Sequence, residues 1–347
     1  MYNGVTVLDV HGHVSSPEAT SNYLMLMMAA NTAFPNPLSN TARQTPGLSP
    51  DDFKAASKRH VDYMDARNID VQIIGPRPFR VMGFMEEHLT PAWARFVNDC
   101  IHTQCEDYPD RFIGAAQLPQ LSNAPDTTHV LGELERCVKD LGFIATYASP
   151  DPGGRRTTPG MHEAYWHPLY AKCQEWDIPI IVHGTNALDR RFRVVPHNYQ
   201  LGFYTEQYLA TQFLGHGDVF ERFPELRIVV CHCGGGLDRF HKTDPHLPQK
   251  DLSRNLFFDT CAYESIFLEA AIKQRGVDQM VFGSEAPGSG TSVKNPETGR
   301  PSDDLVPVLE RMTFLSAEDR RKILHDNVLR VFPRLASRLR ATEPARA

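Results

Sequence analysis

The chain has no run of the roughly 20 apolar residues that a membrane-spanning helix needs, so we expect no contact with a membrane core. It also has no excess of basic residues: 36 lysines and arginines stand against 42 aspartates and glutamates, for a formal net charge of −6. A nucleic-acid-binding protein would carry a basic stripe, so no nucleic-acid partner is expected. A small anionic ligand is compatible with this charge, because a few local arginines can outweigh a mildly acidic surface.

Cysteine is scarce and irregularly placed. The seven cysteines are odd in number and have no spacing typical of a disulfide framework. The N-terminal residues 1–4 do not begin a basic and then apolar leader of the secretory type. Together these absences predict a protein of the reducing cytoplasm.

The 347 residues are 41% hydrophobic and 22% charged, as in an ordinary globular protein. Short apolar runs rich in β-branched residues alternate with segments of helical pattern. Most of these runs are continuous, which is typical of parallel strands that are covered on both faces. Strands are predicted at residues 5–10, 71–74, 112–116, 143–147, 178–182, 228–230, 256–258 and 280–282.

Helical patterns fill the gaps between the predicted strands. The clearest helix start is at residues 49–52, where a capping serine precedes a proline and two aspartates. Eight strands that alternate with helices predict an α/β fold, a (β/α)8 barrel of the TIM type that could be distorted. An open doubly wound sheet is the alternative, but no glycine-rich phosphate turn follows the first strand. Further helices are predicted at residues 91–107, 124–141, 163–176, 204–223 and 264–275.

Two segments interrupt this alternation. Residues 14–50 are rich in serine, asparagine, proline and methionine, and a loop this long is uncommon inside a compact domain unless it has a function. We predict a lid over the barrel mouth, with an insertion of no function as the alternative. Residues 286–303 form a second loop. The expected organisation is one barrel domain over residues 1–335 and a polar C-terminal tail over residues 336–347.

Four histidines and a carboxylate follow the predicted strands, where the chemistry of such barrels lies. Residues two apart on a strand point to the same side, so His11 and His13 can bind one metal ion, and Gly12 leaves room for close backbone approach. Any one of these residues alone is more often a core or loop residue. It is improbable that all five of these residues follow predicted strands, at the same end of the barrel, by coincidence. The other three are His183 after the fifth strand, His232 after the sixth and Glu285 after the eighth.

The chain resembles the metal-dependent amidohydrolase superfamily. Within it, the resemblance is to the branch that contains aminocarboxymuconate semialdehyde decarboxylase, resorcylate and carboxyvanillate decarboxylases and 4-oxalomesaconate hydratase. It extends from residues 9–13 (DVHGH) to residues 327–332 (NVLRVF). Its most specific stretch is residues 217–227 (GDVFERFPELR), which leads to His232 and the glycines after it.

This resemblance implies a divalent metal ion, Zn²⁺ or alternatively Mn²⁺, held by His11, His13 and His183. Many members of the branch carry an aspartate where this chain has Glu285. The longer side chain can reach past the metal toward the substrate, which resembles the hydratase members. We therefore predict that Glu285 is the general acid/base and also contacts the metal. The alternative is that Glu285 serves only as a metal ligand.

His232 corresponds to a residue that donates to the substrate, or exchanges protons with it, in this branch. If His232 faces the barrel mouth, strand alternation turns Cys231 and Cys233 away from it. Tyr199 is our candidate for a second proton donor, and a packing role is its alternative.

The resemblance implies a hydratase (hydro-lyase) that adds water to an unsaturated polycarboxylate from aromatic ring cleavage, with 4-oxalomesaconate as the best single candidate. The first alternative is a decarboxylase of an aromatic or muconate-type acid, and the second is a hydrolase of an amide, ester or lactone. A non-catalytic scaffold of the same fold is a different class, which the complete ligand set and Glu285 disfavour.

A polycarboxylate substrate needs cations, and the planar fork of arginine binds carboxylates through two parallel hydrogen bonds. Six arginines follow predicted strands at the correct pole, and we expect two or three of them to face the pocket. The resemblance also implies a homo-oligomer, dimeric or larger. The six are Arg77, Arg191, Arg193 and Arg239, which are predicted to bind substrate, and Arg80 and Arg190.

Overall fold

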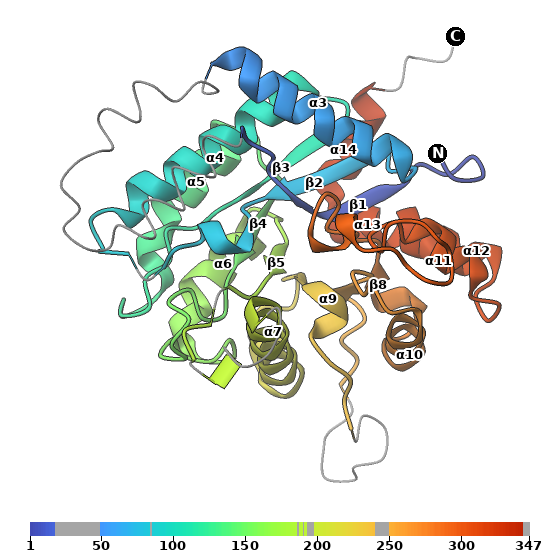
Figure 1. Cartoon of the computed structure of the whole chain (residues 1–347). Helices are drawn as coiled ribbons and strands as arrows, with labels where there is room; N and C mark the ends of the chain where they lie inside the picture. The colour runs from blue at the N-terminus through green and yellow to red at the C-terminus, as the bar shows by residue number, and fades with distance from the viewer. Residues whose placement is uncertain are drawn as a thin grey trace.

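The computed structural model describes residues 1–17, 49–83, 85–185, 187–189, 191–192, 198–239 and 250–342. Eight parallel strands, each paired with the next along the chain, form the centre of the fold (Figure 1). Backbone hydrogen bonds from Val10 N to Phe282 O and from Glu285 N to His11 O, both 2.9 Å, join β1 to the segment at and after β8. This nearly closed barrel confirms the predicted fold. The strands are β1 (Leu8–His13), β2 (Val71–Gly75), β3 (Phe112–Ala116), β4 (Ala145–Ala148), β5 (Ile180–Val182), β6 (Ile228–Val230), β7 (Leu256–Asp259) and β8 (Met280–Val281).

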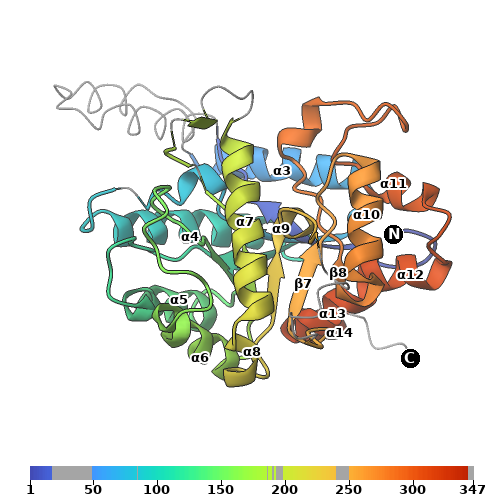
Figure 2. The same cartoon turned by 90° about the horizontal axis from the view of Figure 1, so that it is seen from below.

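The helices of the described residues surround the strands, as Figures 1 and 2 show from two directions. The predicted helix start at residue 49 is confirmed. Ser49 Oγ accepts from Asp52 N at 3.3 Å, and Asp52 Oδ2 accepts from Ser49 N at 3.0 Å, which is the reciprocal capping box of a helix start. The helices are α3 (Pro50–Ala66), α4 (Thr90–Asp107), α5 (Leu131–Lys139), α6 (His167–Glu175), α7 (Asn198–His216), α8 (Val219–Arg222), α9 (Cys231–Gly234), α10 (Ser265–Arg275), α11 (Val306–Arg311), α12 (Ala317–Arg321), α13 (Asn327–Val331) and α14 (Pro333–Thr342).

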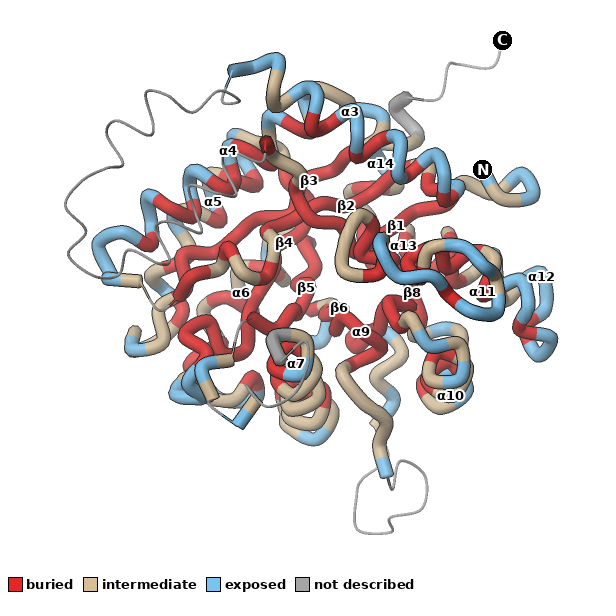
Figure 3. Tube along the Cα trace, in the orientation of Figure 1, coloured by how far each residue is buried: buried red, intermediate tan, exposed pale blue. Residues whose placement is uncertain are grey.

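The buried apolar residues form two layers, one inside the barrel and one between strands and helices. Figure 3 shows that the central strands are buried. Neighbouring residues of one strand belong to different layers: Ile181 belongs to the inner layer, and Ile180 and Val182 to the outer one. Both faces of each strand are therefore apolar, which explains the continuous hydrophobic runs. The inner layer includes Val328 of α13 and Phe332, from the segment that packs near the strand starts. Polar side chains gather at the opposite pole.

The first strand differs from its prediction at residues 5–10, because β1 spans Leu8–His13 and its pairing with β2 shifts between Asp9 and Gly12. His11 and His13 thus lie within the strand rather than after it. A Cβ atom on Gly12 would lie 2.4 Å from Gln72 Cδ, so the group that approaches this glycine closely is a side chain, not the backbone that we expected.

The predicted lid and the predicted C-terminal tail are only partly covered by the described residues. Of the predicted lid at residues 14–50, residues 18–48 lie outside the described part of the chain, and Pro50 already belongs to α3. The boundary expected at residue 335 falls inside α14, which continues to Thr342, because Leu335 is buried in the inner layer. The predicted tail is therefore helical at its start.

Among the described helices, none is long and apolar enough to cross a lipid bilayer.

Candidate metal centre and active site

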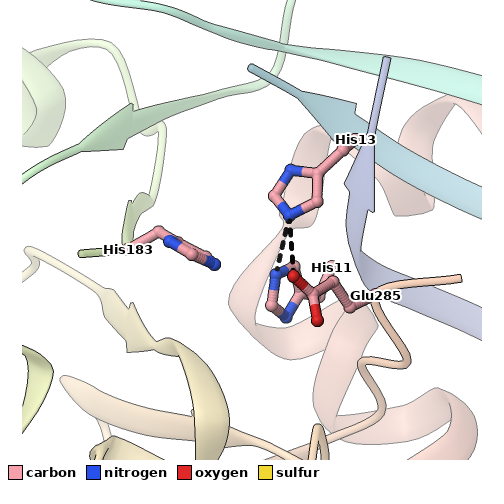
Figure 4. A group of neighbouring side chains, drawn as sticks. All are labelled: His11, His13, His183 and Glu285. Atoms are coloured by element: carbon pink, nitrogen blue, oxygen red, sulfur yellow. Dashed lines mark hydrogen bonds and ion pairs between the residues drawn. The ribbon is translucent and has the colours of Figure 1, made fainter. Parts of the chain in front are cut away.

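Four of the predicted residues meet at the C-terminal ends of the strands. His11 and His13 lie on β1, His183 follows β5 directly, and Glu285 lies in the segment after β8. All four are buried, and each offers one ligand atom within 4.8 Å of those of the other three. Figure 4 shows the three imidazoles and the carboxylate turned toward one another.

The contacts inside this cluster are short and join nitrogen and oxygen atoms that normally accept hydrogen bonds. His11 Nε2 lies 3.3 Å from His13 Nε2, and His13 Nε2 lies 3.6 Å from Glu285 Oε1 (Figure 4). Whether these atoms carry protons is decided by what holds the other nitrogen of each ring.

Backbone carbonyls hold the outer nitrogens of two rings. His13 Nδ1 lies 2.8 Å from Pro76 O, and His183 Nδ1 lies 2.7 Å from Gly184 O. A carbonyl oxygen can only accept, so Nδ1 carries the proton in both rings. In the neutral imidazole, Nε2 of each ring then presents a lone pair to the centre of the cluster.

A carboxylate holds the third ring. His11 Nδ1 lies 2.7 Å from Asp259 Oδ2, at the end of β7, and both side chains are completely buried. Burial alone would lower the pKa of His11, but Asp259 raises it above its usual value, and the metal-binding form of this ring is the neutral one, with a lone pair on Nε2. Such a carboxylate–histidine pair is the usual support of a metal-binding imidazole, because it fixes the ring and increases its basicity.

The arrangement fits a divalent metal ion. Three Nε2 lone pairs and a carboxylate oxygen repel one another unless a cation lies between them. His183 Nε2 is buried and has no hydrogen-bond partner among the described residues, which is costly for a polar atom unless a ligand occupies that direction. Imidazole and carboxylate groups in such a set are typical ligands of Zn²⁺ and of related transition metals.

Burial and charge set the protonation of these groups. Burial lowers the pKa of His13 to about 4 and that of His183 well below its usual value, so both rings are neutral at pH 7. Burial alone would raise the pKa of Glu285, but its contacts with His13 and His232 hold this pKa well below its usual range. Neutral rings and an ionised carboxylate are the forms that bind a metal ion.

Four further side chains contact the other oxygen of Glu285: His232, Tyr263, Ser289 and Cys261. His232 Nε2 lies 3.8 Å from Glu285 Oε2, and its Nδ1 lies 3.0 Å from Gln207 Oε1 on α7. The hydroxyl of Tyr263 donates to the same Oε2 at 2.5 Å. The Glu285 carboxylate thus has one oxygen at the metal cluster and the other among proton-carrying groups.

The backbone at two of these positions is unusual. Glu285 has φ 59°, and His232 and Cys233 have φ 52° and 56°, in the left-handed region that non-glycine residues rarely adopt. The expectation that strand alternation turns Cys231 away is therefore wrong, because residues 231–234 form a turn after β6 and not strand. Cys231 Sγ belongs to a group with His11 and Asp259 whose ligand atoms lie within 4.8 Å of one another.

Behind the cluster, Asp9 ties β1 to the segment that carries Glu285. Its two carboxylate oxygens accept from the N–H and hydroxyl of Ser284, from His11 N and from Gln72 Nε2. Burial raises the pKa of Asp9 to about 6, although these hydrogen bonds lower it.

The polar network continues from Gln72 to α3. His60 Nε2 lies 2.7 Å from Gln72 Oε1, and its Nδ1 accepts from Gln104 Nε2 at 2.9 Å. Burial lowers the pKa of His60 to about 3, so this ring is neutral. The network joins α3 and α4 to the floor of the candidate site.

Two predicted arginines lie beside the cluster. Arg77 follows β2 and donates through Nε to Val14 O at 3.2 Å, directly after His13. Arg80 is buried and donates to Ser16 Oγ at 2.5 Å. Both guanidinium groups are thus held by the segment that follows β1.

Of the remaining predicted residues, the structure describes the side chains of Arg191 and Arg239. The Arg191 side chain is 79% exposed and pairs with Asp189 at 2.5 Å, and Arg239 is exposed. A role of either in substrate binding stays a prediction. Outside the described residues lie Arg190, Arg193 and the side chain of Tyr199.

Asp259 and Tyr263 were missed by the sequence analysis. The predicted seventh strand ended at residue 258, one residue before Asp259, so a search of all eight strand ends with a tolerance of one residue would have found it. No sequence pattern marks Tyr263, whose contact with Glu285 depends on the path of the chain after β7.

A barrel of eight parallel strands with three histidines and a carboxylate at its C-terminal pole defines a class of metal-dependent barrel enzymes. Residues 8–334 match the family model described as amidohydrolase. The chain belongs to the amidohydrolase family.

Known relatives cover nearly the whole chain. The 2-keto-4-carboxy-3-hexenedioate hydratase of a Sphingobium species is 30% identical over 352 residues, 96% of this chain and 98% of that protein. The crystal structure of 4-oxalomesaconate hydratase from Rhodopseudomonas palustris superimposes with a TM-score of 0.80 at 28% identity, over 97% of this chain and 98% of that one.

Decarboxylases are also among the relatives. The gamma-resorcylate decarboxylase of a Polaromonas species is 28% identical over 66% of this chain and 76% of that protein. A dihydroxybenzoic acid decarboxylase from the same genus, crystallised with manganese and 2-nitroresorcinol, shares the fold with a TM-score of 0.67 at 23% identity, over 95% of this chain and 97% of that one.

Proposed function

We propose that this chain is a metal-dependent hydratase that adds water across the activated double bond of an unsaturated polycarboxylate, with 4-oxalomesaconate as the leading candidate. Its end-to-end similarity to two proteins named as hydratases of unsaturated oxo acids supports this assignment. In the same proposal the protein works in the cytoplasm as a homo-oligomer.

The observation that carries the proposal is the divided role of the Glu285 carboxylate. Oε1 lies 3.6 Å from His13 Nε2 in the metal cluster, whereas Oε2 lies near His232 and Tyr263. A base for hydration needs this placement, because it must take a proton at the metal side and pass it to an acid that protonates the neighbouring carbon.

His11, His13, His183 and Glu285 would hold the metal ion, which we take to be Zn²⁺, with Mn²⁺ as the alternative. When bound, the metal supplies Lewis-acid polarisation of an enol or carbonyl oxygen of the substrate. The protein groups do the rest: Asp259 orients the His11 ring, and Ser284 and Asp9 hold the backbone that carries Glu285.

Proton transfer is assigned to the residues around Glu285. The ionised Glu285 removes a proton from the attacking water, whose oxygen forms the new carbon–oxygen bond. His232 or Tyr199 delivers a proton to the adjacent carbon or to the oxygen conjugated with it. Tyr263, through its hydrogen bond to Oε2, holds the carboxylate in the orientation that leaves Oε1 available.

The test is a product-mass measurement on the Zn²⁺-loaded protein with a panel of unsaturated oxo di- and tricarboxylates that includes 4-oxalomesaconate. Gain of one water is the expected result. Loss of carbon dioxide would overturn the proposal in favour of the decarboxylase reaction named for several relatives. No conversion of any member of the panel would also overturn it.

A further inference from the structure

A polar cavity lies next to the segment that carries Glu285. It encloses about 280 Å³ between α3 and the segments that follow β1, β2 and β8. Arg77 lines it, and so does Pro287, two positions after Glu285. His60 also lines the cavity, and its Nε2 lies 3.3 Å from the carbonyl oxygen of Ala286, so the cavity borders the segment that carries Glu285.

The walls of this cavity are positively charged. Arg59, Arg77 and Arg80 line it together with hydroxyl groups of Ser15 and Ser16, and none of its described lining residues is an aspartate or glutamate. We call it the arginine cavity. Its volume accommodates a carboxylate with a short carbon chain attached.

Two of these charges are held inside the protein at a cost. Burial and the neighbouring charge of Arg77 lower the pKa of Arg80 to about 10, and burial also lowers the pKa of Arg77. The charge of Arg77 therefore disfavours the charge of Arg80, whereas Glu285 favours the charge of Arg77, and an anion beside both guanidinium groups would relieve the cost at Arg80. The hydrogen bonds to Val14 O and Ser16 Oγ keep both groups at the cavity wall.

We propose that the arginine cavity is a carboxylate-binding subsite, in which Arg77 and Arg80 hold the substrate carboxylate that lies farthest from the reacting double bond. This inference rests on the proposed hydratase function and deepens it, because it assigns the requirement for a di- or tricarboxylate to named residues. An unsaturated acid with one carboxylate would reach the metal centre but leave the arginine cavity without an anion.

The experiment compares binding of two inert probes, tricarballylate and acetate, to the metal-loaded protein by titration calorimetry. In Arg80→Gln, tricarballylate binding should weaken by about 10- to 100-fold, the usual value of a hydrogen bond between charged groups, while acetate binding stays unchanged. Arg80→Lys keeps the positive charge but loses the planar guanidinium group. Its affinity for tricarballylate should lie between those of the wild type and of Arg80→Gln. Arg254→Gln removes a surface arginine that is 78% exposed and should bind both probes as the wild type does.

Several outcomes would overturn the proposal that the arginine cavity is a carboxylate-binding subsite. One is unchanged tricarballylate binding in Arg80→Gln. Another is binding of sulfate that depends on Arg80 without competing with tricarballylate, which would assign the cavity to an inorganic anion. If Arg80→Gln does not fold, as judged by its melting curve, Arg77→Gln gives the same comparison.

Kinetics separate this proposal from the proposed function. Conversion of a tricarboxylate with an unchanged KM in Arg80→Gln would overturn the subsite and leave the hydratase standing. Absence of any hydration in the wild type, with Arg80-dependent tricarballylate binding, would overturn the function and leave an anion site.

Discussion

The metal centre and the arginine cavity lie side by side at one pole of the barrel but bring together opposite kinds of groups. At the metal centre three imidazole lone pairs and the Glu285 carboxylate converge, which suits a cation. In the arginine cavity guanidinium and hydroxyl donors converge, which suits an anion. The difference teaches that this pole of the barrel has one region suited to a cation and another suited to an anion, as the proposed polycarboxylate subsite requires.

The two regions are also built differently. Each histidine of the metal centre lies on or directly after a strand, and a second contact fixes its ring. The arginine cavity is formed by connecting segments and by the surface of α3. Strand ends give precise geometry for the metal, whereas connecting segments can differ without disturbing the barrel, so substrate choice can be altered independently of the metal centre.

The largest effect is expected for Glu285→Gln, which removes the base but keeps the side-chain shape. We expect kcat to fall by about 10²- to 10⁴-fold, the usual contribution of a positioned base. The histidines should still hold the metal, as measured by elemental analysis, and tricarballylate should still bind in the arginine cavity. Glu225→Gln, at a site 65% exposed, is the matched control. Full activity in Glu285→Gln would contradict the assigned base.

Asp259→Asn should affect the metal centre alone. Loss of the carboxylate that orients His11 should weaken metal binding by about 10- to 100-fold, as is usual for such supporting groups. Competition with a chelator measures this affinity. The control is Asp278→Asn, at a position 63% exposed, and equal metal affinity in both variants would show that Asp259 does not support the ligand.

Tyr263→Phe tests the link between the base and its surroundings. Removal of the hydroxyl that donates to Glu285 Oε2 should lower kcat by about tenfold and leave KM and metal content unchanged, because a hydrogen bond to a charged group is lost. Tyr165→Phe removes another tyrosine hydroxyl, which donates to Leu121 O at 3.1 Å far from the cluster, and should leave kcat unchanged. If both variants behave alike, Tyr263 is a structural residue only.

The last effect concerns the stability of the protein and not its activity: it involves His60, which lines the arginine cavity, and it appears only below neutral pH. Burial lowers the pKa of this ring to about 3, so the unfolded chain takes up a proton below pH 6.5 that the folded protein does not. The free energy of unfolding should therefore fall as the pH falls, by about 1.4 kcal/mol per pH unit between pH 6.5 and 3 from this group.

His60→Gln should reduce this slope. Urea unfolding of the wild type and the variant between pH 7 and 4.5 measures the difference, and the exposed residue His88, changed to Gln, provides the control. A slope that is the same in His60→Gln and in the wild type would mean that the folded protein protonates His60 readily.

The barrel and the core of the metal centre could be predicted because they depend on regular strands. Continuous apolar runs revealed all eight strands, and histidines at strand ends must converge in such a barrel. The strand boundaries were less predictable: the shifted pairing between Asp9 and Gly12 placed His11 and His13 inside β1. This shift depends on the packing of Gln72 against Gly12, a long-range contact that no local pattern contains.

What lies beyond the strand ends could not be predicted. The left-handed backbone at His232 and Glu285 changes the direction of both side chains, and alternation rules do not apply to it. The sequence analysis predicted substrate binding for Arg191 and not for Arg80, yet Arg80 is buried whereas Arg191 is exposed. Burial of a residue after a strand is decided by the helices around it, here α3, and not by its own neighbours in the chain.

The hydrogen bonds between Asp9 and Ser284, 275 positions apart, have a consequence for how the protein is made. The ribosome adds Glu285 to the chain 272 residues after His13 (285 − 13 = 272). The nascent chain must therefore grow by all of these residues before the two halves of the centre can meet. A chain that stalls before Glu285 carries the histidines but has no complete site in which to retain a metal ion.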